Sequence, residues 1–171
     1  MDDGRAFGEI DEPVIAIGVL AQKAGLSASA VRKYENEGLI ISRRTLSGHR
    51  LFSHQDVRRV RNIQHMIQDL GLNIEGIRRM QALLPCWDLH PCGMATRRSC
   101  PARKDGARPC WMIKGLECTA GTDQCRDCVV YRFGSLCTED LKRLLYGQSE
   151  SRSAAVAIKE LIEGKRPCDE E

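Results

Sequence analysis

Eight of the nine cysteines in this 171-residue chain lie in one stretch, and their spacing could support metal or redox chemistry. Cys125 and Cys128 have two residues between them, a spacing that lets both sulfurs face one metal ion. Eight thiolates are enough for two four-sulfur sites, so we predict that all of them are metal ligands. The predicted ligands are Cys86, Cys92, Cys100, Cys110, Cys118, Cys125, Cys128 and Cys137.

Apolar side chains are scarce between residues 86 and 137, so this segment lacks the material for an ordinary hydrophobic core. Metal can replace such a core, because the free energy of metal binding becomes folding free energy. Zinc sites usually use two tight Cys-x2-Cys pairs and only one occurs here, so the spacing favours an iron–sulfur cluster slightly over zinc. Two alternatives stay open: permanent disulfides, which suit secreted proteins, and a redox-active thiol switch.

The basic charge of the chain is concentrated N-terminal to the cysteine segment. The formal net charge is +3, but residues 14–85 hold eleven Lys and Arg against five Asp and Glu, a net +6. A basic folded segment can attract a polyanion such as nucleic acid. No apolar run approaches the roughly 18 residues that span a bilayer, and the acidic N-terminus does not resemble a secretion signal. We therefore expect a cytoplasmic protein without a membrane partner.

The elements that would position this charge begin with two short helices. A helix over residues 17–24 is expected to end at Gly25, since glycine suits the left-handed end of a helix. A second helix is expected to start after Ser27, which can cap it, and to end at Gly38. Two short helices joined by a tight turn are typical of a helix-turn-helix.

A hairpin and two longer helices are expected next. Residues 39–41 and 50–52 are β-prone on either side of a Leu-Ser-Gly-His turn, which predicts a small hairpin, or wing. A long helix should follow the capping residue Ser53, with its apolar side formed by Val57, Val60, Ile63, Ile67 and Leu70. The next helix should end at Pro85. Its inward-facing side chains are expected to be those of Ile74, Ile77, Met80, Leu83 and Leu84.

This order predicts a DNA-binding surface. The second helix of a helix-turn-helix enters the major groove, and the wing then lies along the adjoining sugar-phosphate backbone. Cationic side chains can neutralise phosphate or donate to guanine, and a tyrosine hydroxyl can donate to phosphate. The predicted DNA contacts are Arg32, Lys33 and Tyr34 on the helix, and Arg43, Arg44, His49 and Arg50 on the wing.

Residues 15–84 resemble the MerR family of bacterial transcription regulators. The resemblance is carried by Arg32-x-Tyr34-Glu35, by Gly38-Leu39 and by the wing pattern Arg44…Gly48-His49-Arg50-Leu51-Phe52. It implies a homodimer on a pseudo-palindromic operator that reshapes promoter DNA and so acts on RNA polymerase indirectly. By motif position it implies that Arg32, Tyr34, Arg44 and Arg50 contact DNA, whereas Lys33 departs from the aromatic residue common there.

The chain departs from this family after the fourth helix, where members usually continue into a long dimerisation helix. Here Pro85 and the cysteine segment intervene, so dimerisation through residues 138–163 or through the cysteine segment is a hypothesis. The Cys-Trp pair occurs twice in this segment, at Cys86 and at Cys110. The segment therefore resembles doubled Cys-Trp modules of bacterial sensory and regulatory proteins.

We therefore expect a mainly α fold in four parts. These are a flexible acidic N-terminus (1–13), a winged helix-turn-helix domain (14–85), a small metal-stabilised cysteine-rich module (86–137), and C-terminal helices with a tail (138–171). The expected function is transcription regulation on promoter DNA, with the cysteine-rich module sensing metal, redox state or an iron–sulfur cluster. The alternative is a regulator whose module is a structural zinc site or docks another protein. No catalytic arrangement is present, so no enzyme is expected.

Overall fold

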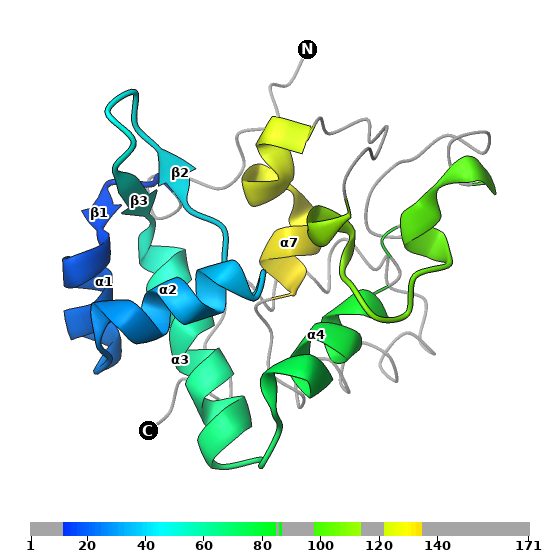
Figure 1. Cartoon of the computed structure of the whole chain (residues 1–171), viewed down its shortest axis with the longest axis horizontal. Helices are drawn as coiled ribbons and strands as arrows, with labels where there is room; N and C mark the ends of the chain where they lie inside the picture. Colours follow the sequence, from blue (N-terminus) through cyan, green and yellow to red (C-terminus); the bar gives the residue numbers. More distant parts are fainter. Residues whose placement is uncertain (1–11, 85, 87–97, 114–121, 135–171) are drawn as a thin grey trace, which may run out of the picture. The chain divides into compact units, whose positions relative to one another are not determined.

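The computed structural model describes residues 12–84, 86, 98–113 and 122–134 (Figure 1). The chain divides into two compact units, residues 1–64 and 65–171, each of which is described by itself. This division falls within the third helix, whereas the composition of the sequence changes at residue 86. The helices predicted over residues 138–163, together with Cys92, Cys118 and Cys137, lie outside the described residues.

The helix-turn-helix is present and its boundaries follow local chemistry. Helix α1 (Ile17–Ala24) ends at Gly25, whose φ of 68° lies in the left-handed region that favours glycine. Helix α2 (Ala28–Asn36) starts after Ser27, whose hydroxyl accepts a hydrogen bond from the Ala30 amide at 3.2 Å. Both helices and the signals at Gly25 and Ser27 are therefore confirmed, and Gly38, which follows the last turn of α2, also has a left-handed φ, of 74°. The two helices contact each other, and Leu20 of α1 and Val31 of α2 are both fully buried.

The wing is part of a three-stranded antiparallel sheet with strand order β1-β3-β2 (Figure 1). Strands β2 (Arg43–Arg44) and β3 (Arg50–Phe52) form the predicted hairpin, with Arg44 opposite Arg50. The sequence did not predict β1 (Ile15–Ala16), which pairs with β3 and places Ile15 opposite Phe52. The prediction of an extended strand at residues 39–41 is wrong, because this segment is an irregular turn whose Leu39 and Ile40 are buried in the core.

Helix α3 (His54–Gln68) begins with a reciprocal cap, in which the sequence predicted the role of Ser53. The Asp56 carboxylate accepts from the Ser53 amide at 2.7 Å, and the Asp56 amide donates to the Ser53 hydroxyl at 3.2 Å. The predicted apolar side is confirmed at Val57, Val60 and Ile63, and is wrong at its end. There Leu70 lies beyond the helix and is 38% exposed, while Met66 is buried.

The side chains of two arginines of α3 donate hydrogen bonds to backbone carbonyls of other segments in the first unit. The Arg59 side chain is buried, and its Nε donates to the Leu39 carbonyl at 2.6 Å. Arg61 Nη2 donates to the Lys23 carbonyl, near the C-terminal end of α1, at 2.7 Å. A cation at a helix C-terminus satisfies a carbonyl that has no partner within its own helix. These bonds attach α3 to the helix-turn-helix and to the turn before the wing.

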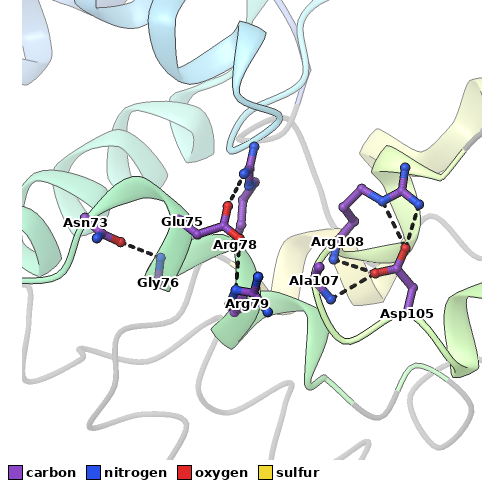
Figure 2. Close-up of polar contacts among 8 residues, drawn as sticks. All are labelled: Asn73, Glu75, Gly76, Arg78, Arg79, Asp105, Ala107 and Arg108. Carbon is purple, nitrogen blue, oxygen red and sulfur yellow. Dashed lines mark hydrogen bonds and ion pairs between the residues drawn. The ribbon is translucent and has the colours of Figure 1, made fainter.

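Helix α4 (Ile74–Ala82) belongs to the second unit and has a polar first turn (Figure 2). The Asn73 side chain caps it by accepting from the Gly76 amide at 2.7 Å, and Glu75 forms ion pairs with Arg78 and Arg79. The hydrogen bond from Arg78 is the main reason why the pKa of Glu75 is below its usual value.

The inward side of α4 differs from the prediction in two places. Ile77 and Leu84 are buried as expected, but Leu83 is 74% exposed, so its predicted inward position is wrong. Gln81 is buried instead, with 3% of its surface exposed, and its Nε2 donates to the Gly134 carbonyl at 2.9 Å. A partner 53 residues away in the chain explains why helical spacing alone did not select this polar residue.

The described parts of the cysteine segment are mostly tight 3₁₀ turns: η2 (Pro101–Arg103), η3 (Cys110–Met112) and η4 (Thr122–Asp127). One α-helix follows, α7 (Val129–Phe133), which buries Val130, Tyr131 and Phe133. The Trp111 ring packs edge-on against Tyr131, with ring centroids 5.3 Å apart. Few apolar side chains are buried in these ranges, as the composition predicted. None of the helices in the described ranges has the length and apolar character of a membrane span.

Candidate nucleic-acid interface

Helix α2 buries one side and presents the opposite side to solvent. Val31 and Tyr34 are buried, because residues three apart lie on the same face of a helix. The exposed face repeats with the same period and is formed by Ser29, Arg32, Lys33 and Asn36. The structure therefore brings two of the predicted contacts, Arg32 and Lys33, onto one exposed helical face. Sequence reasoning missed Ser29 and Asn36, which the helical period through Arg32 could have revealed.

Tyr34 is placed differently from the two cations that precede it. Only 8% of its surface is exposed, so most of the ring packs in the core of the first unit. Burial raises the pKa of the Tyr34 phenol, because the phenolate would lose solvation. The hydroxyl therefore stays protonated and can act as a donor. Its contact with DNA stays a prediction, limited to the small part of the side chain that reaches the surface.

The wing tip is ordered by its own hydrogen bonds. The Thr45 amide donates to the His49 carbonyl at 2.9 Å, and the Gly48 amide donates to the Thr45 carbonyl at 2.9 Å. Gly48 has a φ of 81°, which requires a residue without a Cβ for an unstrained turn. The side chains of Arg43, Arg44 and His49 are exposed on this ordered hairpin. They are thus accessible to a partner, their contact with DNA stays a prediction, and Leu46 at the tip is also fully exposed.

Arg50 occupies a different position from the other basic residues of the wing. Its Nε donates to Glu35 Oε2 at 2.5 Å, and the side-chain exposures of Arg50 and Glu35 are 28% and 14%. The other oxygen of the same carboxylate, Oε1, accepts from the Ser42 hydroxyl at 2.5 Å. Glu35 belongs to the same Arg-x-Tyr-Glu motif as Arg32, so this bond joins a predicted DNA contact of the wing to the motif on α2.

The first unit keeps a clear excess of positive charge. Residues 12–64 hold nine Lys and Arg against four Asp and Glu, a net +5. Glu35 and Asp56 are engaged within the unit, since Glu35 bonds Arg50 and Asp56 caps α3. An exposed helical face with two cations and a basic hairpin in one small unit has the chemistry of a surface for a polyanion.

Five of the eight predicted metal ligands lie in the described ranges. Cys86, Cys100, Cys110, Cys125 and Cys128 are half-buried thiols that form no disulfide. Cys125 and Cys128 lie on one tight turn, in which the Cys128 amide donates to the Cys125 carbonyl at 3.2 Å. Among the described residues, no three His, Cys, Asp or Glu side chains gather closely enough to hold a metal ion. Metal ligation therefore stays a prediction, and its other ligands, Cys92, Cys118 and Cys137, lie outside these ranges.

Comparisons with known proteins bear on the same N-terminal region. Residues 15–84 match the sequence model of the MerR HTH family regulatory protein. The chain is 39% identical over 70 residues to the heat shock protein HspR of Streptomyces coelicolor, which covers 41% of this chain and 46% of HspR. It is 37% identical over 68 residues to the HTH-type transcriptional regulator GlnR of Bacillus cereus, covering 40% of this chain and 52% of GlnR.

A third relative is the HTH-type transcriptional regulator TnrA of Bacillus subtilis, 37% identical over 59 residues, which are 34% of this chain and 54% of TnrA. The chain thus spans about half the length of the curated relatives it matches. The family match is to a regulatory protein and not to an enzyme, in agreement with the expectation from the sequence. Together with the observed order of helix, turn, helix and wing, the match shows that residues 15–84 contain a MerR-type helix-turn-helix domain.

Proposed function

We propose that the protein is a transcription regulator that binds double-stranded promoter DNA through the exposed face of α2 and through the wing. One observation carries this proposal: Arg32 and Lys33 share an exposed helical face in the same unit as a basic, ordered hairpin. An α-helix fits the major groove, where cations can reach guanine or phosphate, and a hairpin can follow the adjacent backbone. The names of GlnR and TnrA, both HTH-type transcriptional regulators, support the same reading.

DNA binding by the full chain tests this proposal. A duplex selected from random DNA by the protein itself is titrated by fluorescence anisotropy at several salt concentrations. Arg32→Ala should weaken binding about 5- to 100-fold and relax the sequence preference, as expected when a base contact is lost. Arg44→Ala should weaken binding to all sequences alike and lower the salt slope by about 1, as expected for a phosphate contact.

Arg103→Ala is the matched control, because Arg103 is an exposed cation on η2 and its loss changes the net charge by the same amount. It should leave operator affinity within about twofold of the native value, since Arg103 belongs to neither α2 nor the wing, which carry the proposed contacts. The proposal fails if the native protein shows no salt-dependent binding to any duplex. It also fails if Arg32→Ala and Arg103→Ala bind equally well.

We propose further that the regulator acts as a homodimer on a pseudo-palindromic operator and affects RNA polymerase only through the shape of the promoter. Helix-turn-helix regulators read two half-sites about one helical turn apart, so protein symmetry matches operator symmetry. Sedimentation at micromolar concentration, with and without the selected duplex, tests the dimer. A strict monomer in both conditions contradicts it.

For the cysteine segment we propose a thiolate-bound centre, an iron–sulfur cluster or zinc, that senses metal or redox state. Three features support this: thiols that are not in disulfides, a Cys125–Cys128 turn of chelating length, and few buried apolar side chains around tight 3₁₀ turns. Such a centre would supply folding free energy and a signal that depends on its occupancy. The alternative is structural zinc or a docking module without sensing.

Purification without air followed by absorption spectroscopy and assays of iron, sulfide and zinc separates these possibilities. A visible charge-transfer band with stoichiometric sulfide identifies a cluster, whereas a colourless protein that contains zinc identifies the structural ion. Sensing requires that operator affinity differ between the loaded and the chelated protein. Equal affinities, with the module still folded, would leave only the structural or docking role.

A further inference from the structure

One carboxylate, that of Glu35, joins the recognition helix to both arms of the wing. Glu35 lies in the last turn of α2. Its Oε1 accepts from Ser42, directly before β2, and its Oε2 accepts from Arg50, at the start of β3. The two bonds, each 2.5 Å long, therefore hold the outgoing and the returning arm of the hairpin at its base. We call Glu35, Ser42 and Arg50 the wing clamp.

The clamp also offsets the repulsion between two opposite arginines of the wing. Arg44 and Arg50 lie directly opposite each other on β2 and β3, and like charges in that position destabilise a strand pair. Glu35 compensates the charge of Arg50, whose side chain is largely covered, and leaves the exposed Arg44 as the uncompensated cation. A charge-assisted bond to a carboxylate of 14% exposure is also stronger than an exposed ion pair.

We propose that Glu35 is a positioning residue for DNA binding, and that Arg50 contributes to operator affinity through Glu35 and not through a phosphate contact of its own. The inference rests on the proposed function. By fixing β2 and β3 to α2, the clamp sets the distance between the helical face of Arg32 and Lys33 and the wing cations Arg43 and Arg44. Contacts that are positioned before binding cost less ordering entropy when the duplex is bound.

The sign of the effect of Glu35→Gln distinguishes positioning from simple charge. Removal of a negative charge beside a DNA-binding face should strengthen binding if only net charge matters. Positioning predicts the opposite for the selected operator, roughly three- to tenfold weaker binding, because neutral hydrogen bonds are weaker than charge-assisted ones. Affinity for a non-specific duplex should stay equal or rise. Ser42→Ala, which changes no charge, should weaken operator binding in the same direction by a smaller factor.

A double-mutant cycle with Arg50→Met tests the second half of the proposal. If Arg50 acts through Glu35, Arg50→Met weakens operator binding much less in the Glu35→Gln background than in the native one. If Arg50 instead contacts phosphate, the same loss appears in both backgrounds, and the salt slope falls by about 1 in both. The assignment would be overturned if Arg50→Met weakened operator binding by the same factor in both backgrounds and also lowered the salt slope of binding.

Hydrogen exchange of the free protein separates failure of the clamp from failure of the proposed function. The Thr45 and Gly48 amides are hydrogen-bonded within the wing, and they should exchange at least threefold faster in Glu35→Gln if the clamp steadies the hairpin. Faster exchange in a protein that binds no duplex would refute DNA binding and keep the clamp. Native operator binding with unchanged exchange, or with tighter binding by Glu35→Gln, would overturn the clamp and keep DNA binding.

Discussion

Gln81→Leu should destabilise the second unit, because Gln81 makes a buried hydrogen bond across 53 residues of chain. Gln81 Nε2 donates to the Gly134 carbonyl at 2.9 Å, and both residues are buried. Leucine has a volume close to that of glutamine, so the change leaves no large cavity. What it removes is the donor, and the Gly134 carbonyl is then left buried without it.

The magnitude follows from opposing effects. Loss of a buried hydrogen bond that leaves its acceptor unpaired costs about 1–3 kcal/mol. Gln81 Oε1 is itself buried and accepts no hydrogen bond in the part of the chain that the structure describes, so its removal returns about 1 kcal/mol. The net expectation is a decrease of about 1 kcal/mol in the free energy of unfolding, within a range of about 0–2 kcal/mol.

Denaturant unfolding followed by Trp111 fluorescence is a suitable assay, since Trp111 packs against Tyr131 of α7, the helix that ends at Gly134. A Trp87→Phe background leaves Trp111 as the single tryptophan. Gln68→Leu is the matched control: the same change at an exposed position of α3 should stay within about 0.5 kcal/mol. If Gln81→Leu is as stable as Gln68→Leu, the bond to Gly134 does not hold α4 and α7 together.

Three further predictions follow from local contacts. Ser53→Ala should lower the free energy of unfolding by about 1 kcal/mol, measured by thermal denaturation, because the Asp56 amide loses its cap; an unchanged midpoint would contradict the capping role. Gly48→Ala should lower the free energy of unfolding by about 1 kcal/mol through backbone strain alone, because the φ is positive and an added Cβ meets no atom within 4 Å. Thermal denaturation is again the test, and a gain in stability would refute strain as the cause. Hydrogen bonds from the Ala107 amide, the Arg108 side chain and the Arg108 amide hold the pKa of Asp105 below its usual value (Figure 2). The loop therefore has this stabilisation above the ordinary aspartate pKa and loses it as pH falls through the lowered pKa. An NMR titration of the Arg108 amide should show this acid transition, and Asp105→Asn should abolish it; a transition that persists in the variant would be evidence against the assignment.

Much of the N-terminal fold could be predicted because its signals are local. Helix ends at Gly25 and Ser27, and the cap at Ser53 and Asp56, depend on atoms within four residues of one another. The wing turn around Gly48 is local for the same reason. Cations on the exposed face of α2 could be named from helical spacing and a family motif. Such features depend only on residues that are close in sequence, so they can be predicted without knowledge of the remaining chain.

Other features depended on partners distant in the chain, and only the tertiary structure decided them. The pairing of β1 with β3 joins residues 15 and 52, and it could not be read from a two-residue strand. Gln81 is buried with its Nε2 paired to a distant carbonyl, while Leu83 is exposed, which reverses the order that hydrophobicity alone predicts. The same holds for Arg50, which sequence marked as a DNA contact and the fold placed against Glu35. Amino-acid types determined which groups could be charged, capped or apolar; the fold determined which of them met, because burial and hydrogen-bond satisfaction depend on neighbours that local spacing does not specify.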